Sequence, residues 1–140
     1  MRLILPSPLR DRLAAEARAA FPRECCGLVE GVRHGDEICA LRLHPAGNLA
    51  AEPDRFEIDP AEQFRLLHAL RDTGREIVGC YHSHPNGADR PSPRDRDGAA
   101  EDGLVWLIQP LTAETEGTAR AFVFAGGEFA EMEMRELPSP

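Results

Sequence analysis

Two histidines placed two residues apart are the first side chains in this sequence whose spacing suggests chemistry. His82 and His84 stand at the end of an apolar segment from Glu76 that is typical of a buried strand. Alternate residues of a strand point to the same face, so both imidazoles can share one cation. A catalytic zinc favours imidazole and carboxylate ligands and keeps three of them beside one open position. The pair therefore predicts two ligands of a zinc site.

Asp95 is the best candidate for the third ligand. The segment from Ser92 to Asp95 begins like a helix, with Ser92 as the N-cap and Asp95 at the third helical position, where negative charge is favoured. The Pro/Gly-rich loop of residues 85–91 is short enough to fold this helix start over the strand end. Each of the two motifs also has an alternative interpretation, because Ser-x-x-Asp is a common capping pattern and His-x-His is often unrelated to metal. Their closeness in the sequence favours the metal site.

Size, charge and cysteine use restrict the other possibilities. A chain of 140 residues is expected to form a single domain over residues 1–140. The net charge of −8 argues against nucleic acid and membrane surfaces as partners. No segment resembles a signal peptide or membrane span, so we expect a cytoplasmic protein. The cysteines form no CxxC pair, suit a reducing compartment and are expected to pack as small apolar side chains; they are Cys25, Cys26, Cys39 and Cys80.

Apolar periodicity and turn residues predict the elements that must position these groups. The predicted strands cover residues 2–5, 25–32, 38–44, 55–58, 76–84, 104–108, 119–125 and 129–135. The predicted helices begin at Ser7, Asp59 and Ser92 and end near Ala20, Gly74 and Gly103. This order predicts the α/β class, with a mixed β-sheet flanked by helices.

The second predicted helix has the clearest local signals. Asp59 is its expected N-cap, and Glu62 would complete a capping box. Its apolar face is expected to consist of Phe64, Leu67 and Leu70, and Gly74 is expected at the C′ position. In the first helix, Ser7 is the expected N-cap.

The motifs together resemble the JAMM, or MPN-plus, family of zinc metalloproteases. The run His82-Ser83-His84-Pro85, then six residues, Ser92, two residues and Asp95 is similar to the family signature. The family adds an upstream Glu-x-x-Gly on the strand after the first helix, which Glu24 to Gly27 match, and the segment from Asn48 to Pro60 is similar to bacterial members. The resemblance covers nearly the whole chain and implies the layered, cytidine-deaminase-like fold of that family.

The resemblance also implies roles for the motif residues. His82, His84 and Asp95 would bind one zinc ion, Glu24 would act as general base and then general acid, and Ser92 would donate a hydrogen bond to the oxyanion. Only about ten residues separate Ile108 from Ala119, which favours the small stand-alone prokaryotic type. The implied substrate is the bond after the C-terminal Gly-Gly of a ubiquitin-like protein of sulfur-carrier type.

The same residues argue against two other functions. A non-catalytic scaffold or binding module of the MPN type would lack the metal ligands, whereas all five motif residues stand in this sequence. A zinc nucleoside deaminase needs His-x-Glu and a later Pro-Cys-x-x-Cys, but His84 follows Ser83 and no cysteine follows Cys80. The particular substrate protein, a peptide or an isopeptide bond, and a monomeric or homodimeric state remain open from the sequence.

Overall fold

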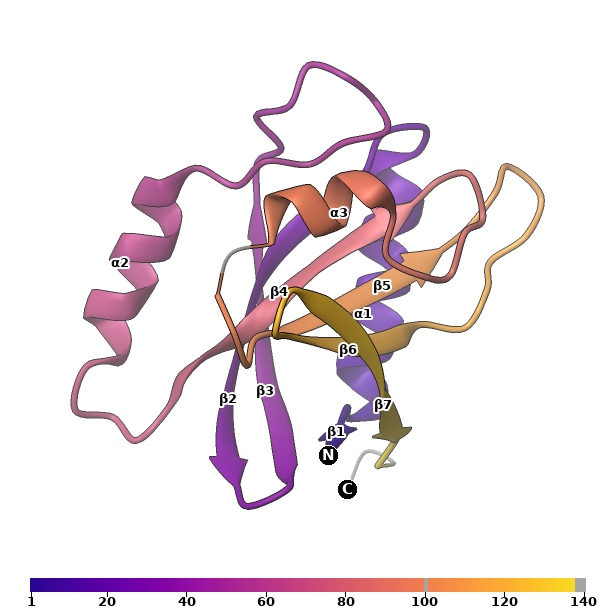
Figure 1. The fold of residues 1–140 in the computed structure, drawn as a ribbon. Helices are drawn as coiled ribbons and strands as arrows, with labels where there is room; N and C mark the ends of the chain where they lie inside the picture. Colours follow the sequence, from indigo (N-terminus) through magenta and orange to yellow (C-terminus); the bar gives the residue numbers. More distant parts are fainter. Residues whose placement is uncertain (100, 138–140) are drawn as a thin grey trace.

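The computed structural model describes residues 1–99 and 101–137 (Figure 1). The elements along the chain are β1 (Arg2–Ile4), α1 (Ser7–Ala20), β2 (Cys26–His34), β3 (Glu37–Ala46), α2 (Pro60–Leu70), β4 (Glu76–His84), α3 (Pro93–Gly98), β5 (Val105–Pro110), β6 (Arg120–Ala125) and β7 (Glu128–Arg135). None of the helices in the described residues is long and apolar enough to cross a membrane.

The strands form one mixed sheet in the order β1-β3-β2-β4-β5-β6-β7, and the sheet closes into a barrel through pairing of β1 with β7. The pairs β1–β3, β1–β7 and β4–β5 are parallel, and the others are antiparallel. The predicted α/β class with a mixed sheet and flanking helices is therefore confirmed. The closure was not predicted, because it joins short segments from opposite ends of the chain.

Helices cover the sheet on both faces (Figure 1). Leu13 of α1 is buried in the main core with Val29, Tyr81 and Leu107. Residues of the opposite strand face form a smaller cluster with α2, made of Leu28, Leu70 and Ile77 with Ile58, Leu66 and Cys80 packed against it. Because strand residues alternate, His82 and His84 belong to the same face as Cys80, and α3 also lies over that face.

Two glycines let the central strands approach closely. A Cβ on Gly27 of β2 would lie 2.3 Å from the ring of the buried Tyr81 and 2.4 Å from the carbonyl oxygen of His44. A Cβ on Gly79 of β4 would lie 2.0 Å from the carbonyl oxygen of Val105. Gly27, the glycine of the Glu-x-x-Gly motif, is thus required by the packing of Tyr81 beneath β2.

Several predicted details of the helices are wrong. Pro6 precedes α1 as its N-cap, while the Ser7 hydroxyl donates to the carbonyl oxygen of Leu137 at 3.0 Å. Asp59 does cap α2, but it accepts from the N–H of Ala61, and the N–H of Glu62 donates to the Asp59 carbonyl, so no capping box forms. The helix also ends at Leu70, before the predicted C′ residue Gly74.

The predicted apolar face of α2 is only partly correct. Leu70 is buried, but Phe64 and Leu67 are 73% and 53% exposed, and Leu66 packs on the sheet instead. The helix reaches the sheet mainly through its C-terminal turn, so its rotation follows Leu66 and Leu70, which are four residues apart.

Other differences concern one predicted strand and the end of the third helix. The predicted strand at 55–58 is reduced to one bridge between Asn48 and Ile58. The third helix ends at Gly98 rather than near Gly103. All four cysteines are free, as predicted, but only Cys26 is fully buried.

Candidate metal centre

Three electron-rich atoms from β4 and α3 converge on one point. The Nε2 atoms of His82 and His84 lie 3.0 Å apart, and Asp95 Oδ2 lies 3.2 Å from the first and 3.0 Å from the second. With zinc–ligand bonds of 2.0–2.1 Å, two ligands of a tetrahedral ion are about 3.3 Å apart. The triangle therefore has nearly the size that one zinc ion requires.

The Asp95 carboxylate is held in place by the first turn of α3. The N–H of Ser92 donates to Asp95 Oδ2 at 2.8 Å, and the N–H of Asp95 donates to Ser92 Oγ at 3.1 Å, which completes a capping box. The same oxygen that closes the box also faces both imidazoles. The capping interpretation of Ser-x-x-Asp is thus confirmed, and the capping box leaves Asp95 Oδ2 facing the two imidazoles that were predicted as ligands.

Each imidazole is oriented by its surroundings. His84 Nδ1 donates to the carbonyl oxygen of Ala88 at 3.0 Å, which turns Nε2 of the same ring toward Asp95. His82 stacks on Phe56 with ring centroids 4.3 Å apart and meets Trp106 edge-on at 5.7 Å. Among the described residues, buried His82 Nδ1 has no hydrogen-bond partner. Packing against the two aromatic rings and the contact of Nε2 with Asp95, rather than a hydrogen bond at Nδ1, therefore set the orientation of His82.

Glu24 approaches the same point from the segment just before β2, not from the strand itself as the family resemblance implied. A carboxylate oxygen of Glu24 and one nitrogen each of His82 and His84 all lie within 4.8 Å of one another. Glu24 is 5% exposed, and its Oε1 has no hydrogen-bond partner among the described residues. Burial raises the pKa of Glu24 to about 7.

The charges of the cluster are strongly coupled. Burial lowers the pKa of His82. For Asp95, burial acts upward, but the hydrogen bonds with His82 and His84 outweigh it and hold the pKa of Asp95 well below its usual range. For His84, burial acts downward, yet the contact with Asp95 leaves the pKa of His84 raised. The hydrogen bonds with the imidazoles therefore favour the charged form of Asp95, whereas burial disfavours the charged form of Glu24.

The donor set fits a zinc ion. Two imidazole nitrogens and one carboxylate oxygen satisfy the count of a catalytic site with one open position. Glu24 is a fourth group within reach, and its unpaired oxygen suits a base facing that open position. Asp95 Oδ2 lies close to both imidazole nitrogens and is oriented by α3, which makes it the better third ligand.

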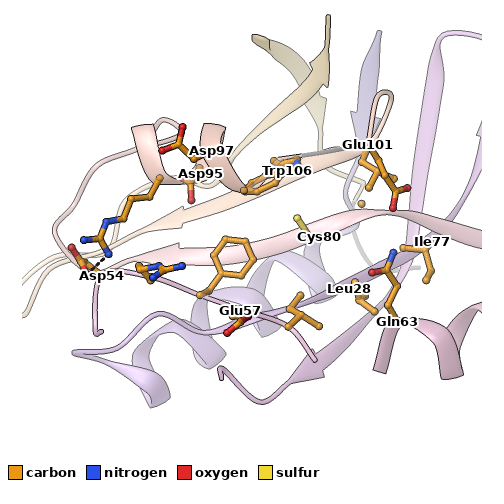
Figure 2. Close-up of a pocket in the computed structure, with 17 residues that line it drawn as sticks. Leu28, Asp54, Glu57, Gln63, Ile77, Cys80, Asp95, Asp97, Glu101 and Trp106 are labelled. Carbon is orange, nitrogen blue, oxygen red and sulfur yellow. Dashed lines mark hydrogen bonds and ion pairs between the residues drawn. The ribbon is translucent and has the colours of Figure 1, made fainter. Parts of the chain in front are cut away.

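Two cavities border this centre. The first, of about 680 Å³, runs from Asp95 past Trp106 and Cys80 toward Leu28 and Ile77 (Figure 2). The second, of about 570 Å³, is lined by Glu24, His84 and Ser92 together with the prolines of neighbouring loops. Asp54 and Arg94 line both cavities and form an ion pair of 3.3 Å.

All five residues singled out from the sequence lie around this centre. The other histidines do not: His44 pairs with Glu30 at 2.7 Å, His68 lies in the last turn of α2 and His34 ends β2. Sequence reasoning missed the contributions of Phe56, Asp54 and Arg94. Phe56 stood within a segment already noted as similar to bacterial relatives, which was the only signal available.

Comparison with known proteins identifies the family. Residues 6–124 match the family described as prokaryotic homologues of the JAB domain. A desampylase of Haloferax volcanii is 36% identical over 136 residues, covering 94% of each chain. A probable TtuB-protein conjugate cleaving protease of Thermus thermophilus is 31% identical over 127 residues, covering 90% of this chain and 78% of the relative.

A solved structure agrees with these matches. The solution structure of a protein from Desulfitobacterium hafniense superimposes with a TM-score of 0.86 at 31% identity, covering 99% of this chain and 94% of that one. The fold, the motif residues and the relatives all agree with the resemblance found in the sequence. The chain therefore belongs to the prokaryotic JAB-domain family, the prokaryotic type of the JAMM/MPN-plus group.

Proposed function

We propose that this chain is a zinc-dependent peptidase or isopeptidase that cleaves after the C-terminal Gly-Gly of a ubiquitin-like protein of sulfur-carrier type. The observation that carries the proposal is the convergence of His82, His84 and Asp95 beside the unpaired carboxylate oxygen of Glu24. A relative of similar length is named for cleaving TtuB–protein conjugates, which supports the substrate class. One domain over residues 1–140 is proposed to carry the activity.

The proposed site separates metal binding from proton transfer. His82, His84 and Asp95 would hold one zinc ion, which supplies a water molecule with a pKa of about 7 and polarises the scissile carbonyl. Glu24 accepts the proton of the attacking water and returns it to the departing amine. A carboxyl group with a pKa of about 7 suits both steps, because it gains and loses a proton readily near neutral pH.

Ser92 is proposed to stabilise the oxyanion of the tetrahedral intermediate. Its Oγ already accepts a hydrogen bond from the N–H of Asp95, so the hydroxyl hydrogen remains available to donate into the second cavity. One donor of this kind typically contributes about 3 kcal/mol to transition-state stabilisation. The capping box thus fixes the ligand and the oxyanion donor together.

The two cavities suit an extended tail on one side of the scissile bond and a leaving group on the other. The first cavity has apolar walls that include Leu28, Ile77 and Trp106, and a rim with Glu57 and Glu101 (Figure 2). An extended tail would lie there, and the amine product would leave through the second cavity. Between the two cavities the substrate tail would pass the Asp54–Arg94 ion pair, and glycine is the residue that needs the least room there.

The proposed function is tested with a panel of ubiquitin-like proteins extended beyond Gly-Gly. Each is prepared with either a linear extension or an isopeptide-linked lysine, incubated with the zinc-loaded protein and measured by intact mass. A product ending in Gly-Gly, absent with the Glu24→Gln variant, supports the proposal. No cleavage of any panel member, with one zinc bound, contradicts it.

The scaffold alternative is separated by metal analysis of the purified protein. About one equivalent of zinc per chain supports the enzyme; the short distances among His82, His84 and Asp95 support this expectation. A protein that takes up no zinc, even after zinc is added, supports a non-catalytic scaffold.

A further inference from the structure

The peptide group that joins Glu24 to Cys25 is held on both of its polar atoms by side chains. Its carbonyl oxygen, that of Glu24, accepts from Asn48 Nδ2 at 3.1 Å. Its N–H, that of Cys25, donates to Ser83 Oγ at 2.8 Å. Glu24 precedes β2, so no regular strand pairing holds it. These two hydrogen bonds replace the missing strand pairing at the base of the Glu24 side chain.

Asn48 uses all the hydrogen-bonding capacity of its amide. Nδ2 donates to the carbonyl oxygens of Glu24 and Arg55, at 3.1 and 2.8 Å. Oδ1 accepts from the N–H groups of Ala50 and Glu57, at 2.9 and 3.0 Å. An amide has two donors and two acceptor sites, so its orientation is fully determined. Asn48 therefore links Glu24 rigidly to the loop that leads from β3 to α2.

That loop also reaches the metal ligands. Phe56 lies between Arg55 and Glu57, both of which bond to Asn48 through their backbone atoms, and the Phe56 ring stacks on His82. The backbone of Glu24 and the ring that orients His82 are thus joined through one side chain.

Ser83 joins Glu24 to the ligands from the other side. It stands between His82 and His84 on β4, and its side chain points to the opposite face of the strand and is fully buried. Its N–H donates to the carbonyl oxygen of Cys25 at 3.1 Å, and its Oγ accepts from the Cys25 N–H. Ser83 therefore makes a double contact with the residue that follows Glu24.

We propose that Asn48 and Ser83 are positioning residues that fix the Glu24 carboxylate relative to the imidazoles of His82 and His84. The inference rests on the proposed role of Glu24 as the general base. A shift of about 1 Å in a reacting group can cost about 100-fold in rate. With both polar atoms of its peptide held, the Glu24 backbone cannot rotate without breaking one of these bonds.

The test compares Asn48→Ala and Ser83→Ala with the parent as zinc-loaded proteins. Each variant should lower kcat by about 10- to 100-fold while KM and the zinc content stay at parental values. Asn48→Asp keeps an acceptor for Ala50 and Glu57 but lacks the donor to Glu24, so it should lose kcat as Asn48→Ala does. Asn48 is only partly buried, so its variants keep the test available if Ser83→Ala does not fold.

Thr73→Ala is the matched control. Thr73 Oγ1 donates to the carbonyl oxygen of Leu70 and accepts from the N–H of Arg75, so its loss also removes two bonds between a side chain and the backbone. Thr73 lies in the turn between α2 and β4, and the kcat of the Thr73→Ala variant should equal that of the parent. A general effect of lost stability would instead lower kcat in the control as well, and would overturn the inference.

Glu24→Gln in the same assay separates the two proposals. If Glu24→Gln retains full activity, the proposed role of Glu24 fails. If Glu24→Gln is inactive while Asn48→Ala and Asn48→Asp keep the parental kcat, the role of Glu24 stands and the positioning inference alone is wrong.

Discussion

Ser92 and Asp95 exchange hydrogen bonds in both directions, with Ser92 N–H to Asp95 Oδ2 at 2.8 Å and Asp95 N–H to Ser92 Oγ at 3.1 Å. Such boxes usually serve only to satisfy the free N–H groups at a helix start. Here Oδ2 of the box also lies 3.0 Å from His84 Nε2. Local helix capping and the proposed metal site therefore share one atom, and a change at Asp95 should affect both.

Asp95→Asn should weaken zinc binding by more than about 100-fold, because it removes the anionic ligand and leaves a weaker amide oxygen. Glu24→Gln should bind zinc as tightly as the parent, since Glu24 is proposed as a base and not as a ligand. Zinc affinity is measured by competition with a chromogenic chelator. Asp97→Asn, an exposed change on the same helix, is the control and should leave zinc affinity unchanged. If Glu24→Gln lost zinc while Asp95→Asn retained it, Glu24 would be the ligand and the assignment of Asp95 as the third ligand would be wrong.

The activity should depend on the ionisation of Glu24. Burial raises its pKa to about 7, and a protonated carboxyl group cannot accept the proton of the attacking water. We therefore expect kcat/KM of the zinc-loaded protein to fall about tenfold per pH unit below the pKa of Glu24 and to level off above it; the positive charge of zinc would move that pKa below the metal-free value of about 7. The profile is measured between pH 5 and pH 9 at constant ionic strength. A kcat/KM that rises as the pH falls below 7 would contradict this expectation.

The same pKa predicts a pH-dependent cost in stability for the metal-free protein. The folded state holds the proton of Glu24 more tightly than the unfolded chain does, because the pKa of Glu24 is raised in the folded state. The contribution of the protonated carboxyl group to folding stability is therefore complete below the unfolded pKa of about 4.5 and is lost as the pH rises through about 7. Glu24→Gln removes this charge burial. It should be more stable than the parent by about 1–3 kcal/mol at pH 8 and equal to it at pH 4. The free energy of unfolding of both metal-free proteins is measured with urea at pH 4 and pH 8. Equal stability of the two proteins at pH 8 would contradict the expectation that a buried charge on Glu24 destabilises the parent.

The Asp54–Arg94 pair should contribute to the preference for glycine before the scissile bond. Asp54 and Arg94 line both cavities, so Arg94→Ala should give more room there, and a tail ending in Gly-Ala should be accepted more readily. We expect the ratio of kcat/KM for Gly-Gly over Gly-Ala substrates to fall about 5- to 10-fold. Arg65→Ala removes an exposed ion pair with Glu62 on α2 and is the control. An unchanged ratio in Arg94→Ala would exclude this role.

Much of the site could be predicted because its signals are local. His82 and His84 are two residues apart on one strand, and Ser92 and Asp95 form a capping pattern within one turn of helix. The strand Glu76–His84 was predicted with the bounds that the structure has, since its apolar run is bounded by a Gly-containing turn and a Pro-containing loop. The placement of Glu24 followed only from the family resemblance, because it stands 58 positions before His82 in the sequence.

The remaining features depend on contacts between distant segments. The barrel closes through three pairs between β1 and β7, which no local pattern predicts. The rotation of α2 is decided by the small apolar cluster around Leu28 and Ile77 rather than by its own periodicity, so Phe64 and Leu67 are exposed. Asn48 acts through backbone groups of several other residues, and its residue type alone does not indicate such a role.

The central proposal is tested most directly by anomalous diffraction at the zinc edge from crystals of the zinc-loaded protein. We predict one zinc peak bonded to His82 Nε2, His84 Nε2 and an Asp95 carboxylate oxygen, at about 2.0–2.2 Å, with the Glu24 carboxylate facing the ion beyond bonding distance. A zinc ion bonded to Glu24 in place of Asp95, or no zinc at this centre, would contradict the account.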